Sequence, residues 1–70
     1  MERQPVISSN VRSIGYDQAS NTLEIEFTNA GVYQYLSVPE SLYTCLMEAN
    51  SVGSYFHAHI KKAFQCERIV

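Results

Sequence analysis

Two histidines and two cysteines are the side chains best suited to metal binding or nucleophilic catalysis. His57 and His59 are two residues apart, and on an α-helix such residues point about 200° apart, so both imidazoles cannot hold one ion. Cys45 and Cys66 lack the close ligand pairing of structural zinc sites. A cysteine beside a histidine could form a nucleophile–base pair, but no orienting group or oxyanion donor stands at a recognisable spacing. We therefore expect no catalytic residue, no metal and no cofactor, and a protein that is not an enzyme.

Paired carboxylates offer a second kind of chemistry. Glu24 and Glu26 would point to the same side of a strand and could act as a general acid and base. Alternating glutamates are far more often the solvated face of an amphipathic strand, and we interpret this pair in that way. The three glycines, Gly15, Gly31 and Gly53, form no phosphate-cradling loop.

Tyr33 and Tyr35 are candidates for binding, because aromatic side chains on a sheet can stack on nucleobases. Their position depends on the turn before them. A three-residue loop over 29–31 with Gly31 in the left-handed conformation pairs Phe27 with Tyr33 and Ile25 with Tyr35. Both tyrosines then lie on the core face. We favour core packing over a stacking platform, with their hydroxyls at the rim.

A second candidate site is the start of the last predicted helix. Ser51 and Gly53 stand at a helix N-terminus, where free amides and the helix dipole attract anions. Lys61 and Lys62 follow about two turns later, with His57 between. These residues form either a phosphate-contacting surface or a solvated helix face.

The elements that position these side chains follow from hydrophobic periodicity. Three short strands are expected over 11–16, 22–27 and 32–36, and the apolar residues of the second alternate with Thr22, Glu24 and Glu26. Pro39 begins a helix, with Ser37 as a candidate cap, and its face includes Leu42, Cys45 and Leu46. A second helix, capped by Ser51, continues its apolar spacing to Phe64.

The predicted fold is α+β. A three-stranded antiparallel meander precedes two helices that pack on one face of the sheet, in the order β-β-β-α-α. Residues 67–70 form a short fourth strand or a tail, and residues 1–8 form an N-terminal arm. The 70 residues are expected to make a single domain over 1–70.

Composition restricts the class of partner. The net charge is −2, but the last 20 residues carry three basic and one acidic side chain, so the C-terminal stretch is mildly basic. No apolar run suggests a signal peptide or a membrane span. We expect a cytoplasmic protein that binds no membrane and has no structural disulfide.

Several short segments together resemble one known family, the KTSC domain. They are Ser8-Ser9, 14–17, 23–27, 31–35 with its Tyr-x-Tyr, Val38-Pro39, 49–53 with its Ser-x-Gly, Tyr55-Phe56 and Ile60-Lys61. The resemblance covers roughly residues 6–68. This family is named for a short domain at the C-terminus of some lysyl-tRNA synthetases, and it also occurs as small stand-alone proteins. It has no established activity, and the resemblance implies RNA binding only by association with the synthetases.

Two functions remain open. The first is a weak, salt-dependent RNA- or nucleotide-binding module that uses Tyr33, Tyr35, Ser51, Gly53, His57, Lys61, Lys62 and Arg68. The second is a protein-interaction module or homodimer, in which open sheet edges or an apolar spot at Val32 and Leu36 is covered by a partner.

Overall fold

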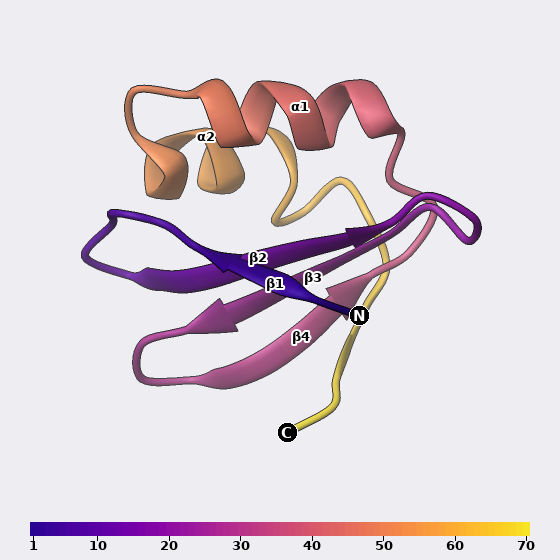
Figure 1. The fold of residues 1–70 in the computed structure, drawn as a ribbon, viewed down its shortest axis with the longest axis horizontal. Helices are drawn as coiled ribbons and strands as arrows, with labels where there is room; N and C mark the ends of the chain where they lie inside the picture. The colour runs from indigo at the N-terminus through magenta and orange to yellow at the C-terminus, as the bar shows by residue number, and fades with distance from the viewer.

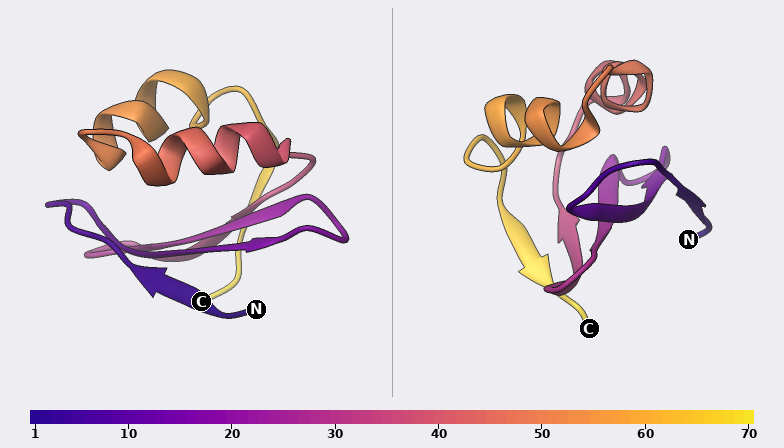
Figure 2. Two further views of the ribbon diagram at one scale, coloured as in Figure 1. Left: turned by 45° about the horizontal axis from the view of Figure 1, so that its top comes forward. Right: turned by 90° about the vertical axis from the view of Figure 1, so that its left-hand side faces the viewer.

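The computed structural model describes residues 1–70 and contains five strands and two helices. Figure 1 labels both helices and the strands β1 to β4, and the right-hand view of Figure 2 shows the C-terminal strand as a yellow arrow. Both helices cover one face of the sheet, and the two turned views show the opposite face without a helix (Figure 2). The elements are β1 (Arg3–Pro5), β2 (Val11–Asp17), β3 (Thr22–Phe27), β4 (Gly31–Tyr35), α1 (Glu40–Glu48), α2 (Val52–His59) and β5 (Cys66–Arg68). The sheet is antiparallel throughout, and its strand order β1-β2-β3-β4-β5 is also the chain order.

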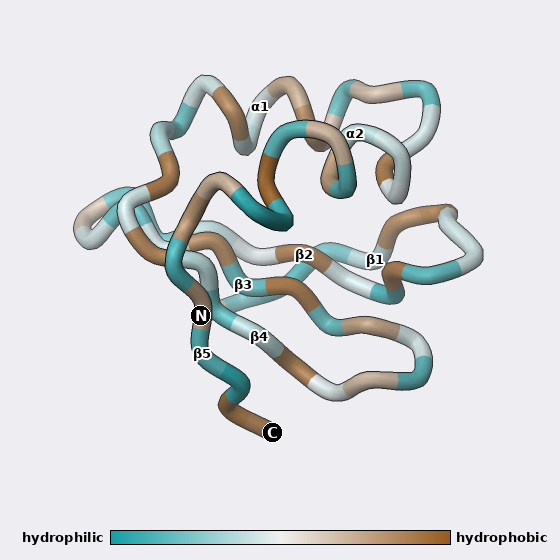
Figure 3. Tube along the Cα trace, turned by 180° about the vertical axis from the view of Figure 1, so that it is seen from behind, coloured by the Kyte–Doolittle hydropathy of each residue, from teal (hydrophilic) through white to brown (hydrophobic).

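The three expected strands are present, within one residue of their predicted ends. The C-terminal segment is a strand rather than a tail, which confirms one of the two alternatives, and β1 is an additional strand that was not expected. The sheet therefore has five strands instead of three or four. The core lies between the sheet and the helices. Figure 3 shows apolar segments along the central strands and along the helices that face them. The core consists of Val11, Ile14, Leu23, Ile25, Tyr35, Val38, Leu46, Val52, Phe56 and Ile60.

The β3–β4 turn confirms the predicted face and corrects the predicted register. Gly31 has a φ of 85°, the left-handed conformation that glycine adopts without steric cost. Phe27 pairs with Gly31 and Ile25 with Tyr33, so the loop is 28–30 and the pairing is two residues away from the expected one. Side chains alternate with a period of two, so this shift leaves Tyr33 and Tyr35 on the core face.

The N-terminal segment is not a free arm, because Arg3–Pro5 pairs with β2. Gly15 of β2 makes the close approach of this strand feasible. A β-carbon on Gly15 would lie 2.7 Å from the carbonyl oxygen of Glu2 and 3.0 Å from Cγ of Arg3. The backbone of Glu2, the residue before β1, and the side chain of Arg3 thus occupy the space that a side chain at residue 15 would need.

The helix-free face of the sheet carries a polar network rather than two solvated glutamates. Glu24 is only 5% exposed, which corrects the sequence-based interpretation for this residue. It forms an ion pair with Arg3 and accepts a hydrogen bond of 2.9 Å from Gln34 Nε2. Burial opposes ionisation, but the hydrogen bonds from Gln34 and Arg3 and the charge of Arg3 together hold the pKa of Glu24 below its ordinary value.

The apolar spot expected on this face is also covered. Val32 is 5% exposed, because the chain after β5 lies beside it. The backbone nitrogen of Ile69 donates to the carbonyl oxygen of Val32 at 2.8 Å. Leu36 is half-buried.

The residues at which the two helices begin are close to the predicted ones, but the predicted cap and one predicted core residue of α1 differ. Pro39 occupies the N-cap of α1, and Ser37, the expected cap, instead has a positive φ of 59°. Leu46 is buried as predicted, whereas Cys45 is exposed and not a core residue. The hydroxyl of Ser51 caps α2 by accepting a hydrogen bond from the Ser54 nitrogen at 3.2 Å.

The second helix ends at His59, five residues before Phe64, where its predicted pattern ends. The backbone nitrogens of Ile60 and Lys61 both donate to the carbonyl oxygen of Phe56, at 2.9 and 3.0 Å, which closes the helix in a tight turn. The chain must turn here, because β5 has to run back along β4. His59 is exposed and lies against Tyr55 with ring centroids 4.4 Å apart.

Candidate nucleic-acid interface

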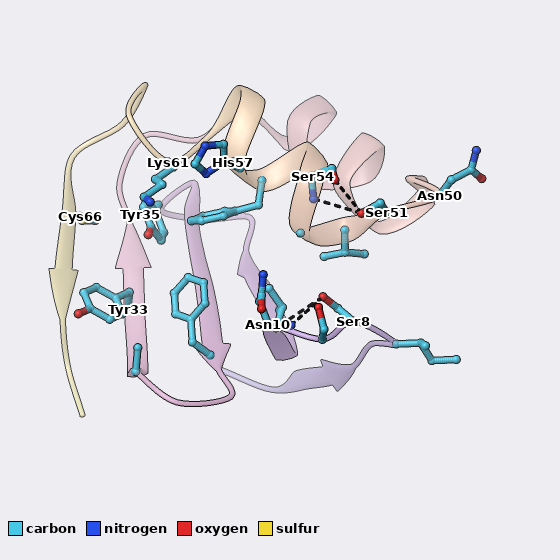
Figure 4. Close-up of a pocket in the computed structure, with 18 residues that line it drawn as sticks. Ser8, Asn10, Tyr33, Tyr35, Asn50, Ser51, Ser54, His57, Lys61 and Cys66 are labelled. Carbon is cyan, nitrogen blue, oxygen red and sulfur yellow. Dashed lines mark hydrogen bonds between the residues drawn. The ribbon is translucent and has the colours of Figure 1, made fainter.

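A groove of about 910 Å³ runs between α2 and the helix-facing side of the sheet (Figure 4). The loop before β2 forms one wall and the first part of α2 forms the other. The lining residues are Ile7, Ser8, Ser9, Asn10, Val11, Phe27, Ala30, Tyr33, Tyr35, Asn50, Ser51, Val52, Gly53, Ser54, Phe56, His57, Lys61 and Cys66. A volume of this size lies at the upper end of those found for small-molecule sites, about 300–1,000 Å³.

Four aromatic rings form a continuous cluster in the groove. Phe27 meets Tyr33 with ring centroids 5.6 Å apart and meets Phe56 at 5.4 Å, and both contacts are edge-to-face. Tyr35 meets Phe56 in the same way. Tyr35 and Phe56 are buried, whereas Phe27 and Tyr33 are half-buried and keep part of their rings accessible from the groove. The core face and the groove thus share the same tyrosines, and Tyr33 can both pack and contact a ligand.

One end of the groove is neutral and rich in hydrogen-bonding groups. The hydroxyl oxygen of Ser8 accepts hydrogen bonds from the backbone nitrogens of Asn10 and Val11, at 3.3 and 3.4 Å, and so fixes the loop. Gly53 of α2 faces this loop. A β-carbon there would lie 3.6 Å from Ser8 Oγ and 3.8 Å from Asn10 Nδ2, so the loop and the helix nearly meet and close this end.

The other end carries the positive charge. Lys61 lines the groove near Tyr35, and His57 lies beside it on the last turn of α2 (Figure 4). No Asp or Glu lines the groove, although the chain has seven acidic residues. A net acidic protein therefore presents a groove whose only formal charge is a lysine, and this arrangement favours an anionic group at that end.

The structure brings six of the eight predicted site residues into this groove: Tyr33, Tyr35, Ser51, Gly53, His57 and Lys61. Lys62 and Arg68 lie outside it. Since α2 ends at His59, Lys61 and Lys62 are in a turn rather than on one helical face, and only Lys61 lines the groove. The Arg68 guanidinium donates from Nε to the carbonyl oxygen of Val70 at 2.9 Å.

Sequence reasoning missed the wall formed by the Ser8–Asn10 segment, and it treated Phe27 only as a core residue. The sequence Ser-Ser-Asn is typical of a turn, but nothing local indicates that this turn faces the start of α2. That placement depends on the pairing of Val11 with Phe27, which brings the loop to the edge of the aromatic cluster.

Cys66 also lines the groove, next to Tyr35 in the β4–β5 pairing. Burial, together with the neighbouring Cys66 and Tyr33, raises the pKa of Tyr35 to about 12, so this hydroxyl remains protonated at neutral pH. Both cysteines are free, and no hydrogen bond joins Cys66 to His57.

No three His, Cys, Asp or Glu side chains gather in a way that could hold a metal ion. Neither helix is long and apolar enough to cross a bilayer.

Comparison with known proteins identifies the family. The sequence model of the KTSC domain matches residues 7–64. A protein of Stutzerimonas stutzeri (strain A1501) is 39% identical over 61 residues, which cover 87% of this chain and 86% of that protein. A lysine–tRNA ligase of Nostoc punctiforme is 38% identical over 61 residues, 87% of this chain but only 11% of the ligase. The crystal structure of a KTSC domain protein from Yersinia pestis superimposes with a TM-score of 0.97 at 48% identity, covering 99% of this chain and 97% of that one. The groove and the fold described above are therefore those of a chain that belongs to the KTSC domain family.

Proposed function

We propose that this domain is a binding module for single-stranded RNA, and that it binds one short segment in the groove without carrying out a reaction of its own. The observation that carries the proposal is the contrast between the groove and the rest of the molecule. The groove has a lysine, accessible aromatic rings and no acidic residue, in a chain whose net charge is −2.

Single-stranded RNA offers the chemistry that this groove complements. Unstacked bases pack on aromatic side chains, each contributing about 1–3 kcal/mol, and the phosphates seek cations. Phe27 and Tyr33 supply the rings, and Lys61 supplies the cation. Recognition of a duplex needs contacts across more than one groove of the double helix, for which a single lysine in a short groove is a poor match. The ligase relative from Nostoc punctiforme carries a segment like this chain in an enzyme named for tRNA, which also supports an RNA ligand.

Two adjacent lysines provide the test. Lys61→Glu and Lys62→Glu change the net charge equally and lie one residue apart, but only Lys61 lines the groove. Binding of labelled single-stranded RNA and of labelled tRNA would be followed by fluorescence anisotropy, at low and at near-physiological salt. We expect Lys61→Glu to weaken binding by about tenfold or more, with Lys62→Glu close to the unchanged protein. Affinity should fall with salt at the slope of roughly −0.7 that one phosphate contact to a single strand gives.

Two outcomes would overturn the proposal. The first is an absence of binding at high micromolar protein even at low salt. The second is an equal loss in both variants, which would indicate a diffuse charge effect rather than a site. A protein-interaction role would gain weight in the first case. It would need a surface other than the one around Val32, because the chain after β5 covers that residue.

A further inference from the structure

We propose that the bound nucleotide has one orientation, with its phosphate at Lys61 and its base on Phe27, where the side-chain amide of Asn10 reads the edge of the base. This inference rests on the proposed RNA binding and adds to it a base-reading residue and a polarity. Phosphate contacts position a nucleic acid, whereas contacts to base edges select its sequence. In this proposal the Lys61 end of the groove makes the phosphate contact and the Asn10 end makes the contact to the base edge.

Asn10 is fixed beside Phe27 by the sheet. Val11 and Phe27 are Cα partners in the β2–β3 pairing, and the backbone nitrogen of Thr28 donates to the carbonyl oxygen of Asn10 at 2.9 Å. The residue before Val11 is thereby held next to the residue after Phe27. A base stacked on the Phe27 ring would present an edge toward Asn10.

The side chain of Asn10 is available for such a contact. Its backbone nitrogen is bonded to Ser8, but its side-chain amide makes no hydrogen bond within the chain. The amide extends into the groove from the strand side (Figure 4), and a β-carbon on Gly53 would lie 3.8 Å from its nitrogen. An amide offers adjacent donor and acceptor atoms, a combination that pairs with the edge of a base.

The reverse orientation has weaker support. A phosphate at the Ser8–Asn10 end would meet the first amides of α2 but no cation, and two of the hydroxyls there are already engaged. Ser8 Oγ accepts two backbone hydrogen bonds, and Ser51 Oγ bonds to both the nitrogen and the hydroxyl of Ser54. Lys61, the formal charge of the groove, lies at the opposite end (Figure 4), so the full positive charge favours one polarity.

The experiment compares Asn10→Ala with Lys61→Gln, using rA, rC and rU oligonucleotides of equal length over a series of salt concentrations. Lys61→Gln should weaken all three by the same factor and reduce the salt slope by roughly 0.7. Asn10→Ala should leave the slope unchanged and reduce the ratio between the tightest and the weakest oligonucleotide by about fivefold or more. Asn29→Ala is the matched control, because Asn29 is exposed in the β3–β4 turn and does not line the groove.

The possible results separate the two proposals. Binding that depends on Lys61 but keeps its base preference in Asn10→Ala would overturn the base-reading role and leave RNA binding in the groove intact. Equal affinity of the unchanged protein for all three oligonucleotides would also overturn the base-reading role of Asn10 and leave RNA binding intact. No binding of any oligonucleotide would overturn both proposals. Circular dichroism should show an unchanged fold for Asn10→Ala, since that side chain has no internal hydrogen bond to lose.

Discussion

The ring of Tyr35 in β4 meets the ring of Phe56 in α2 edge-on, with centroids 5.3 Å apart and planes at 78°. This contact joins the sheet to the helix that forms one wall of the groove. The hydroxyl of Tyr35 lies at the groove, beside Cys66. One side chain therefore supports the core with its ring and contributes a polar group to the candidate site.

We predict that Tyr35 makes folding stability sensitive to alkaline pH. The pKa of Tyr35 is raised to about 12, chiefly by burial, whereas an unfolded tyrosine ionises near pH 10. Between these values the folded state retains a proton that the unfolded state releases, so the free energy of unfolding falls as pH rises. Ultraviolet titration should show one tyrosine ionising last, near 12. That step should be absent in Tyr35→Phe and present in Tyr33→Phe; its survival in Tyr35→Phe would refute the assignment.

Glu24 should contribute stability at neutral pH that disappears in acid. Its pKa is held below the ordinary value despite burial, so its contribution is complete above about pH 4.3 and is lost as pH falls through the lower, folded value. Glu24→Gln should lower the free energy of unfolding at pH 7 by about 1–3 kcal/mol. Urea titrations of the two proteins should converge in acid.

Glu67→Gln is the control for the Glu24 prediction. Glu67 pairs with Gln34 across β4 and β5 but is exposed, and the same substitution there should change stability by less than about 0.5 kcal/mol. Equal losses at the two positions would show that the Arg3–Glu24–Gln34 network has no special role.

Gly53→Ala should separate stability from binding. Gly53 lies in the first turn of α2 without a positive φ, so alanine should stabilise the helix by up to about 1 kcal/mol. Its methyl group would contact Ser8 and Asn10 at ordinary distances of 3.6 and 3.8 Å but would narrow the neutral end of the groove. We expect a higher melting temperature together with weaker RNA binding. Unchanged binding would show that the ligand does not reach this end.

Gly15→Ala should release the first strand. The added methyl group would lie 2.7 Å from the carbonyl oxygen of Glu2, a backbone atom that cannot move unless β1 moves. We expect a loss of about 1–3 kcal/mol in the free energy of unfolding. In a chain that lacks residues 1–5 the same substitution should cost much less, and a double-mutant cycle by urea unfolding measures the difference. Additive losses would contradict the proposed clash.

The strand faces were predictable from the sequence, but the register was not. Alternation of Leu23, Ile25 and Phe27 with polar residues determines which side of the strand faces the core. A shift of two residues keeps every side chain on its face, so the hydrophobic pattern cannot distinguish the observed pairing of Ile25 with Tyr33 from the expected pairing with Tyr35. The geometry of the turn made that choice, starting one residue earlier than expected.

Features that depend on distant partners could not be predicted locally. Arg3–Pro5 has no alternating pattern, and it is a strand because its backbone pairs with β2 and Arg3 reaches Glu24. Apolar spacing past Ile60 resembles a continuing helix, but the return of the chain to the edge of β4 overrides it. Six of the eight candidate residues share the groove. This agreement arises because the strand alternation that places Tyr33 and Tyr35, and the capping of α2 by Ser51, are both present in the fold.

The agreement between strand order and chain order has a kinetic consequence. Neighbouring strands from β1 to β4 are joined by short connections, so they can pair on the microsecond time scale of hairpin formation. The pairing of β4 with β5 must wait until both helices have closed the longer connection, whose entropy cost is larger. Cys66 and the turn that carries Lys61 therefore reach the groove last, and the gain of ligand binding during refolding would report the final step in the assembly of the domain.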